Sequence, residues 1–523
     1  MIDKLLEKRL DGLLTAGGVE ILKGGKKGLE KESLRIDTNG SLAQTPHPHE
    51  WGAPLTHPYI TTDYSEALPE LITPAFSEMH KTIDFLEQTH RFLYQHLSSD
   101  ELLWAASMPC AVSDDTSIPI ARYGTSNNGK MKHIYRVGLD WRYGIKMQAI
   151  AGVHFNYSLP QKLWPIYQGL EKSKAPEQEF INESYFSLIR NFKRLGWMVP
   201  FLFGSSPAVC KSFLAGRTTR FKQHQHGTYY LPHATSLRMS DIGYKNKNQS
   251  SLVVSYDSLN DYCASLETAL RTPYPEYEAI GLHNDGSRIQ LSTSVLQIEN
   301  EYYSFIRPKR TGQSGERSST SLKSRGVEYV EIRALDLNCL SSTGVDIEQL
   351  CFLEAFLIFC LLEESPLLTQ SELGEIEYNE LTVALRGHEP NLKLVEQSRR
   401  HTIKSWSLEI CQRMLPICEA LDALSVNRDY SMALNKQIHA IQFPEFLPAA
   451  KILNELLTNQ QPFQTYAMNI SKNHAAQFRD SPPRDDFSQD FSRLAEVSRS
   501  NQEKLENAEE GSLNEYIEKY LAN

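Results

Sequence analysis

The chain has 523 residues, of which 41% are hydrophobic and 23% charged, and this is typical of a soluble globular protein with a large core. The length fits two to four domains, or one large catalytic domain with insertions. A net charge of -10 argues against general nucleic-acid binding, but it leaves open a bound nucleotide whose charge is met by metal and a few local cations.

No export or membrane segment is expected. Residues 1–14 are amphipathic and lack a basic region followed by a continuous apolar stretch. The most apolar run, residues 350–362, contains Glu354 and is too short to span a bilayer, so a buried helix is predicted there. The eight cysteines are scattered without zinc spacing, and they are predicted to be reduced thiols in the cytoplasm.

The first run with chemical content covers residues 28–36 and is followed by a turn pattern, Asp-Thr-Asn-Gly, at 37–40. Side chains alternate along a strand, so Glu30 and Glu32 point the same way. Two carboxylates aimed together repel each other unless a cation or a proton lies between them. The run therefore predicts a divalent-metal site, in an enzyme that handles metal-bound nucleotide.

Four further runs are predicted to be strands that carry chemistry, over residues 59–74, 147–160, 295–310 and 326–337. A strand with one polar face and one aliphatic face forms the wall of a site and is backed by core. The polar residues of these runs include Asp63, Glu66, Glu70, Gln148, His154, Asn156, Glu299, Glu301, Tyr303, Glu331 and Arg333. Ile150 shares the face of Gln148 and His154.

Beyond about residue 344 the pattern becomes helical, and helices are predicted over 345–364 and 392–424. The charged, amphipathic tail, residues 491–521, is expected to be a surface helix. Before this helical part, the polar and basic run 311–325 is predicted to be a mobile loop that could act as a lid beside a nucleotide site.

Mg²⁺ prefers oxygen ligands and is usually held by a few carboxylates together with nucleotide phosphates. The carboxylates available here are Glu30, Glu32, Asp63, Glu70 and Glu331. They come from separated strands, and each one taken singly is more often a solvated surface group than a ligand. His154 suits Mn²⁺ better than Mg²⁺, and a hydrogen-bonded structural histidine is the alternative.

The basic residues that could meet phosphate are Arg238, Arg307, Lys309, Arg310 and Arg333. Pro308 stiffens the turn that carries three of them, although a solvated basic loop is the alternative reading of that turn. The sequence has no Walker A motif, no Gly-rich dinucleotide loop, no kinase motifs and no nucleophile elbow. A sheet-based site remains, in which metals rather than a glycine loop hold the phosphates.

Eight runs are most informative when taken together: GLEKESLRI, YITTDYSEALPELITP, RYGTSNNGK, MQAIAGVHFNYSLP, FGSSPAVC, YYLPHATSLRMSDIGY, VLQIENEYYSFIRPKR and GVEYVEIRALDL. They resemble glutamate–cysteine ligases of the gamma-proteobacterial type, densely and collinearly over about residues 24–363. The resemblance implies an α+β fold similar to glutamine synthetase, in which a curved, mainly antiparallel sheet forms a funnel. Residues 1–363 would form the catalytic region, and residues 364–523 a helical region packed on the same domain.

The resemblance also implies a two-stage reaction, the first step of glutathione biosynthesis. ATP would phosphorylate the γ-carboxylate of L-glutamate, and the amine of L-cysteine would attack the γ-glutamyl phosphate to give γ-glutamylcysteine. Mg²⁺ is the implied cofactor, and Mn²⁺ can substitute for it. A cytoplasmic monomer is expected, with neither nucleic acid nor membrane as a partner.

Roles for single residues follow from the resemblance. It implies that Arg238 and Arg333 meet glutamate and the transferring phosphoryl group. The implied metal ligands are Glu30, Glu32, Asp63, Glu70, His154 and Glu331. The implied cysteine pocket consists of Tyr135, Leu139, Ile150, Tyr244 and Tyr303. The residues expected to face the nucleotide are Gln148, Arg307, Lys309 and Arg310.

Two rival functions remain open. A sibling ligase would join glutamate to a different amine, and one or two methylenes are worth only about 1–3 kcal/mol of discrimination. A non-catalytic sensor of glutamate or nucleotide would be expected to have lost some metal ligands, whereas every carboxylate of the set is present here.

Overall fold

The computed structural model describes residues 4–112, 117–214, 220–244, 252–313, 315–423, 427–508 and 511–522. Its strands are β1 (Lys26–Glu32), β2 (Arg35–Asp37), β3 (Ile60–Thr62), β4 (Pro69–Ile72), β5 (Glu101–Leu103), β6 (Gly152–Ser158), β7 (Ala208–Cys210), β8 (Lys222–His224), β9 (Thr228–Tyr230), β10 (His283–Asn284), β11 (Ser287–Arg288), β12 (Ile306–Lys309), β13 (Tyr329–Asp336), β14 (Lys393–Glu396) and β15 (Arg399–Thr402).

The α-helices are α1 (Lys4–Gly17), α2 (Glu20–Lys23), α3 (Met79–His96), α4 (Asn127–Tyr143), α5 (Leu163–Leu170), α6 (Glu177–Leu195), α7 (Met198–Phe203), α8 (Lys211–Leu214), α9 (Leu259–Arg271), α10 (Pro275–Ile280), α11 (Ser318–Arg325), α12 (Ile347–Leu362), α13 (Gln370–Arg386), α14 (Ile403–Asp422), α15 (Asp429–Gln442), α16 (Pro448–Thr458), α17 (Phe463–Asp480), α18 (Asp485–Asn507) and α19 (Leu513–Ala522). Short 3-10 turns are η1 (His49–Trp51), η3 (Ile145–Ala149), η4 (Gln225–Gly227), η6 (Glu299–Glu301) and η7 (Pro444–Phe446).

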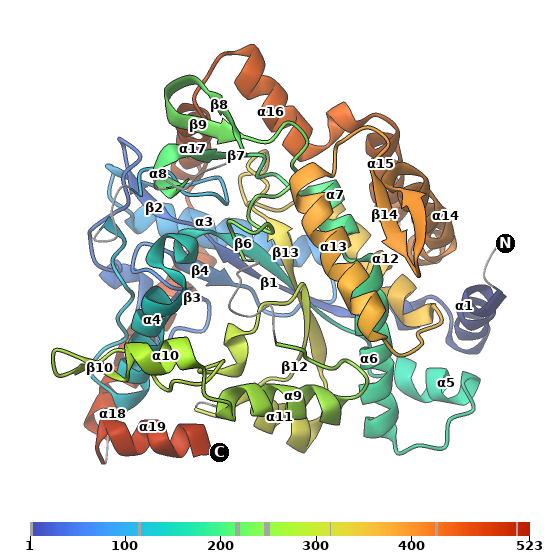
Figure 1. Ribbon diagram of the computed structural model, residues 1–523, viewed down its shortest axis with the longest axis horizontal. Coiled ribbons are helices and arrows are strands. Elements are labelled where there is room, and N and C mark those ends of the chain that lie inside the picture. Colours follow the sequence, from blue (N-terminus) through green and yellow to red (C-terminus); the bar gives the residue numbers. More distant parts are fainter. Residues whose placement is uncertain are drawn as a thin grey trace.

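A six-stranded sheet in the order β12-β13-β6-β1-β4-β3 crosses the middle of the molecule (Figure 1). Neighbouring strands in it are all antiparallel. Val153, Phe155 and Tyr157 of β6 are fully buried on one face, while His154 shares the other face with Glu30 of β1, its direct register partner. The period of two along these strands therefore separates an aliphatic back from a polar front.

Helix α12 lies in the core and is buried around its whole circumference. Asp346 and Gln349 form a capping box that starts it, and this satisfies backbone donors that a buried helix end would otherwise leave unpaired. Helices α6, α14 and α15 pack around α12. Glu354 of α12 forms an ion pair with Lys27 of β1, with Nζ and Oε1 2.6 Å apart. The prediction of a buried helix at 350–362 is confirmed.

Several of the predicted strands are shorter or split in the structure. Residues 28–36 divide between β1 and β2, which belong to different sheets. Residues 59–74 form two strands, β3 and β4, which pair as a hairpin. In residues 147–160 the strand begins only at Gly152, because η3 precedes it, and in residues 295–310 only β12 is extended. The predicted alternation of polar and apolar side chains therefore holds within β6 but does not extend back to Gln148.

The helical predictions also need correction. Run 311–325 was expected to be a loop, but its second half is α11, and residue 314 lies outside the described residues. Residues 392–424 begin with the hairpin β14–β15 before α14 starts at Ile403, and the tail consists of two helices, α18 and α19. Local periodicity alone did not separate these strands from the helix that follows them.

The prediction that all cysteines are reduced is wrong for one pair. Cys110 and Cys210 form a disulfide, with their Cα atoms 5.4 Å apart. Six other cysteines are free and buried. The pair is separated by 100 residues in sequence, so its proximity arises only from tertiary folding. Among the described residues, no helix combines the length and apolar character needed to cross a bilayer.

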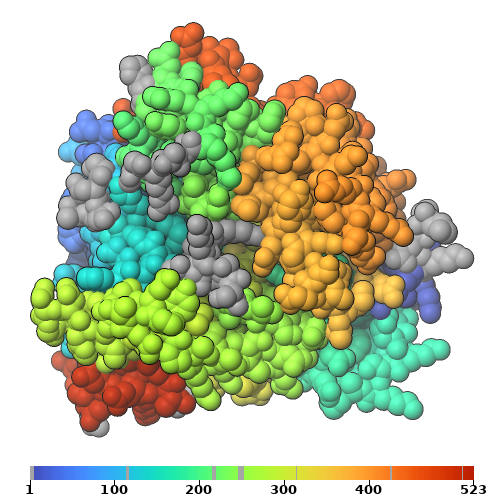
Figure 2. Space-filling view, viewed as in Figure 1, coloured from blue at the N-terminus to red at the C-terminus, as the bar shows by residue number. Residues whose placement is uncertain are grey.

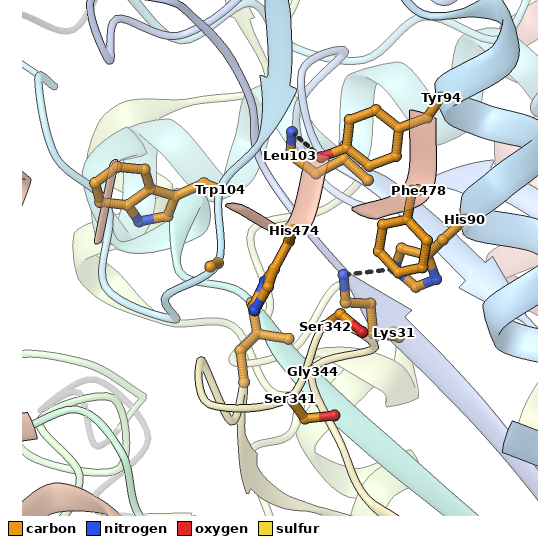
Figure 3. Close-up of a pocket in the computed structure, with 12 residues that line it drawn as sticks. Lys31, His90, Tyr94, Leu103, Trp104, Ser341, Ser342, Gly344, His474 and Phe478 are labelled. Atoms are coloured by element: carbon orange, nitrogen blue, oxygen red, sulfur yellow. Dashed lines mark hydrogen bonds between the residues drawn. The ribbon is translucent and has the colours of Figure 1, made fainter. Parts of the chain in front are cut away.

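The back of β1 borders a small cavity with a mixed polar and apolar lining, shown in Figure 3. Lys31 lies there, 4% exposed, with its Nζ 2.9 Å from His90 Nε2 and hydrogen-bonded to Ser33. His474 of α17 and the loop at Ser341 complete the wall. Alternation along β1 thus sends Lys31 away from Glu30 and Glu32.

Candidate active site

A cavity of about 360 Å³ lies on the polar front of the sheet and is closed on another side by α4. Glu30 and Glu32 both line it, as the alternation along residues 28–36 predicts. The predicted site residues that line it are Glu30, Glu32, Asp63, Glu70, Tyr135, Leu139, Gln148, His154, Tyr244, Tyr303, Arg307, Lys309, Glu331 and Arg333. Segments as far apart in sequence as Glu30 and Arg333 therefore supply one cavity.

Glu30, His154 and Glu331 form the tightest group in it. One ligand atom from each lies within 4.8 Å of the others. His154 Nδ1 is 3.0 Å from Glu30 Oε2 and 3.9 Å from Glu331 Oε1. Burial and the charge of Arg333 lower the pKa of His154, so its imidazole is neutral and available as a ligand.

Basic side chains surround Glu331 on two strands. Lys309 Nζ is 3.4 Å from Glu331 Oε1, and Arg333 Nη1 is 3.1 Å from Oε2. Arg307 lies opposite Glu331 in the register of β12 and β13, with Nη1 3.9 Å from Oε2. Burial opposes ionisation, but Lys309 and Arg333 hold the pKa of Glu331 well below its usual range. This end of the cavity is charged and rich in fixed donors.

A second acidic group extends along the neighbouring strands. Glu32 lies directly opposite Glu70 in the register of β1 and β4, and Asp63 lies beside them. Burial and the charge of Asp63 raise the pKa of Glu32 to about 8, and burial with the charge of Glu30 raises the pKa of Glu70 well above its usual range. Like charges directly opposite each other destabilise a sheet unless a cation separates them.

These donors fit hard divalent cations. The oxygen-rich set of carboxylates, with one neutral imidazole, matches Mg²⁺ and accommodates Mn²⁺. The raised pKa values of Glu32 and Glu70 arise without a cation, and binding one would favour their ionised forms. The residues present therefore fit the metal that the sequence predicts.

The other end of the cavity is aromatic. Tyr244 and Tyr303 stack with ring centroids 5.3 Å apart, and Gln148 hydrogen-bonds to Tyr303. Tyr135 and Leu139, one turn apart on α4, complete this wall. The cavity thus joins a charged end suited to phosphates with a softer end suited to an apolar side chain.

The sequence pattern of the family described as "Glutamate-cysteine ligase" matches residues 10–383. A glutamate–cysteine ligase from Alcanivorax borkumensis is 46% identical over 99% of each chain, and one from Pseudomonas entomophila is 43% identical over 100% of this chain and 98% of its own. The chain belongs to the glutamate–cysteine ligase family. Its reaction is the ATP-dependent formation of γ-glutamylcysteine, the first step of glutathione synthesis.

Solved structures agree with this membership. A glutamate–cysteine ligase from Francisella tularensis, in complex with AMP, matches with a TM-score of 0.90 and 33% identity over 95% of this chain and 98% of that one. A bifunctional glutathione synthetase from Pasteurella multocida matches with a TM-score of 0.71 and 22% identity, over 90% of this chain and 55% of that one, and it supports the fold alone.

Three residues that the sequence assigned to the ligase site do not line the cavity. Arg310 turns outward toward Gly326 O and Glu328. Ile150 is fully buried, and its carbonyl accepts a hydrogen bond of 3.0 Å from the Tyr244 hydroxyl. Arg238, 1% exposed, lies behind the wall, 4.8 Å from the Tyr244 ring centroid. Strand parity and position in a motif cannot distinguish a wall residue from the residue that supports it.

Sequence reasoning missed several cavity residues. Lys132 and Arg136 project from α4 on the same face as Tyr135 and Leu139, at spacings of three and four residues. That spacing was visible in the sequence and could have identified them. Tyr520 of α19 also lines the cavity, and no local pattern pointed to it. Further missed lining residues are Tyr64, Met131, Leu291, Ile298 and Asn300, whereas Glu301, which the sequence placed on a polar face without a role, also lines the cavity.

Proposed function

We propose that the protein carries out both stages of γ-glutamylcysteine synthesis in this one cavity. The observation that supports it is the meeting of Glu30, His154 and Glu331 with Lys309 and Arg333, beside an aromatic pocket. Phosphoryl transfer requires charge neutralisation at one end, and the amine acceptor requires a separate, oriented pocket at the other.

Glu30, His154 and Glu331 would hold one Mg²⁺ or Mn²⁺, and Glu32, Asp63 and Glu70 would hold further cations. A bound cation would neutralise phosphate charge and align the phosphates of ATP with the acceptor carboxylate. The register of the strands fixes these ligands, because Glu30 lies opposite His154 and Glu32 lies opposite Glu70.

The basic side chains would act on the transferring group. A γ-carboxylate oxygen of L-glutamate attacks the γ-phosphorus of ATP, and the bond to ADP breaks. Arg333, Lys309 and Arg307 lie where they can donate hydrogen bonds to oxygens that carry the phosphoryl charge. We propose that Arg333 is the catalytic residue among them, since its guanidinium lies 3.4 Å from His154 and bridges toward the acid cluster.

The aromatic end would hold L-cysteine. Its amine attacks the acyl carbon of γ-glutamyl phosphate, phosphate leaves, and the amine loses a proton. A thiol side chain suits Tyr135, Leu139, Tyr244 and Tyr303, because it is soft and hydrogen-bonds weakly. Arg238 and Ile150 would act indirectly, since both contact Tyr244 from behind.

At the level of the whole chain, we propose a glutamine-synthetase-like funnel in which the antiparallel sheet would be curved. Residues 1–363 would form the catalytic region, and residues 364–523 a helical region packed on the same domain. Helix α14 packs on α12 and α17 packs on α3, and these contacts favour one unit. We further propose a cytoplasmic monomer, because ATP and free L-cysteine are cytoplasmic substrates; sedimentation and cell fractionation test this.

A coupled assay of ADP release tests the function, with ATP, Mg²⁺, L-glutamate and L-cysteine each omitted in turn. We expect full turnover only with all four present. Binding of ATP and glutamate without phosphate release on addition of cysteine would instead indicate a sensor. Faster ADP release with another amine would indicate a sibling ligase.

Glu331→Gln tests the metal cluster within this function. We expect kcat to fall about a hundredfold or more, with weakened dependence on Mg²⁺, because a metal ligand is lost. The variant should fold but melt at a lower temperature, because Lys309 and Arg333 lose a buried partner. Glu328→Gln is the matched control, since its carboxylate faces Arg310 outside the cavity. Normal activity of the Glu331 variant would remove that residue from the metal set.

A further inference from the structure

The C-terminal helix α19 is attached to the rest of the molecule beside the active site. It packs on α4, and Figure 2 shows the red C-terminal segment at the surface against the yellow-green segment above it. Ile517, fully buried, anchors it in a small cluster with Met131, Ile134 and Leu291. This cluster is separate from the main core.

Two polar contacts hold the same helix. Arg288 Nη1 donates a hydrogen bond of 2.9 Å to Asn514 Oδ1, and Asn127 Nδ2 donates one of 3.4 Å to the carbonyl of Gly511. The contacts lie near the start of α19, and Ile517 lies at its middle. The helix is therefore fixed in rotation, and one defined face is turned toward α4.

Tyr520 lies on that face, because it follows Ile517 by three residues. Its side chain lines the catalytic cavity. Burial, with the charge of Glu299, raises its pKa, so the hydroxyl stays protonated. A residue that is more than 180 positions beyond β13 in sequence thus contributes to the site that β13 builds.

The side chains with which Tyr520 shares the Ile517 cluster are apolar or aromatic, whereas Glu299 and Arg317 are the charged groups near its hydroxyl. Met131, Tyr135, Leu291 and Ile298 all belong to, or pack against, the Ile517 cluster, and all four line the cavity. Tyr135 also packs against the main core, so it joins the two. These four side chains are themselves uncharged.

We infer that Tyr520 is a further specificity-determining residue for the amine acceptor, with its ring closing the apolar end of the acceptor pocket. This rests on the proposed function, which puts L-cysteine against Tyr135. Helix α19 serves as a wall of that pocket, and the width of the pocket depends on how α19 is seated. Phosphoryl transfer, at the charged end, does not involve Tyr520.

Steady-state kinetics of Tyr520→Ala test this inference. We expect the KM for L-cysteine to rise about tenfold, as for the loss of a few apolar contacts in a substrate pocket, with the KM values for ATP and L-glutamate unchanged. The preference for L-cysteine over L-norvaline, a longer alkyl acceptor, should fall. Tyr520→Phe should behave like the wild type, because the ring and not the hydroxyl closes the pocket.

Matched variants separate this role from folding. Lys519→Ala changes the exposed face of α19 and should leave all KM values unchanged. Tyr520→Leu keeps apolar packing on the cluster but shortens the side chain, so it should keep the wild-type melting temperature and still raise the KM for L-cysteine. If Tyr520→Ala and Tyr520→Leu both bind L-cysteine normally, or raise the KM for ATP equally, the inference is overturned. A wild-type protein that releases no ADP with L-cysteine would instead overturn the proposed function.

Discussion

Three consecutive residues of β1 lie on opposite faces of the sheet. Glu30 and Glu32 enter the cavity, whereas Lys31 lies behind the sheet against His90 (Figure 3). Within the described part of the chain, no carboxylate lies within ion-pair distance of Lys31. Burial lowers the pKa of Lys31 to about 7. Burial disfavours the charged form of this amine, so the stability of the folded protein depends on pH.

Lys31→Met should remove that dependence. The unfolded chain holds the Lys31 proton up to its ordinary pKa of about 10.4, so the unfolded state binds more protons between pH 7 and pH 10. The free energy of unfolding of the wild type therefore rises with pH between about 7 and 10. Below about pH 7 the folded protein bears the full cost of burying the charged Lys31 amine. Relative to wild type, the melting temperature of the variant should be highest near pH 6.5 and fall toward pH 9.5. A difference that is constant across that range would contradict this assignment.

Arg333→Lys tests whether the phosphoryl group needs a fork of donors. An ammonium keeps the charge but offers no planar pair of N–H groups, so kcat should fall about a hundredfold while the protein stays folded. Arg310→Lys provides the comparison, because Arg310 points out of the cavity. Equal kcat in wild type and the Arg333 variant would exclude the catalytic role.

At the scale of elements, the sequence predicted strands best where alternation ran through a whole element. In β1, Glu30 and Glu32 both reach the cavity, as alternation predicts. In β13, Glu331 and Arg333 also reach it, but the register shifts between Ile332 and Leu335, so Leu335 pairs with Val153 on the back of the sheet. It failed where an element changed type inside a run, as at η3, which carries Gln148 to the cavity from outside β6. Side chains alternate between two faces only along extended backbone. The turn of η3 interrupts this alternation before the pairing of β6 begins.

The start of β6 offers an element-scale prediction. The backbone N–H of Gly152 donates a hydrogen bond of 2.7 Å to Glu32 Oε2, and an added Cβ would come within 2.2 Å of Arg238 Nη2. Arg238 is buried and its Nη2 donates a hydrogen bond of 3.0 Å to the carbonyl of Arg333, so Gly152→Ala should displace it, cost about 1–3 kcal/mol of stability and lower kcat. Urea unfolding and the coupled assay measure both.

Gly169→Ala is the matched control for that variant. Gly169 lies in α5, and nothing lies within 4 Å of its added Cβ. Alanine has the higher helix propensity, so stability should be equal or increase by roughly 0.5–1 kcal/mol. If Gly152→Ala behaves like Gly169→Ala, then Arg238 is not held against β6.

At the scale of the whole molecule, long-range packing was the part that sequence could not reveal. Helices were expected beyond residue 344, but not that α17 and α18 would pack on α3 in the N-terminal half. Phe491 of α18 stacks on Tyr59, with centroids 5.9 Å apart, and lies 5.3 Å from the Phe92 centroid. The period of a helix predicts that a face is buried, but it does not predict which partner covers that face.

The Phe491→Ala substitution should therefore lower the free energy of unfolding of the whole protein. Loss of a ring that is 2% exposed costs about 3–5 kcal/mol, and we expect a lower midpoint of a single urea transition. Val497→Ala on the same helix, 43% exposed, should leave the midpoint unchanged. A separate early transition in the Phe491 variant would show that α18 melts independently.

The strand order of the central sheet has a consequence for biosynthesis. Strands β3, β4, β1 and β6 are adjacent and come from residues 26–158, whereas β12 and β13 join the edge from residues 306–336. A nascent chain on the ribosome therefore emerges with Glu30, Glu32, Glu70 and His154 long before Lys309 and Arg333 are translated. The strands β1, β3, β4 and β6 would bring acid against acid before Lys309 and Arg333 exist to offset them, so cellular Mg²⁺ would help these strands pair well before any nucleotide could dock.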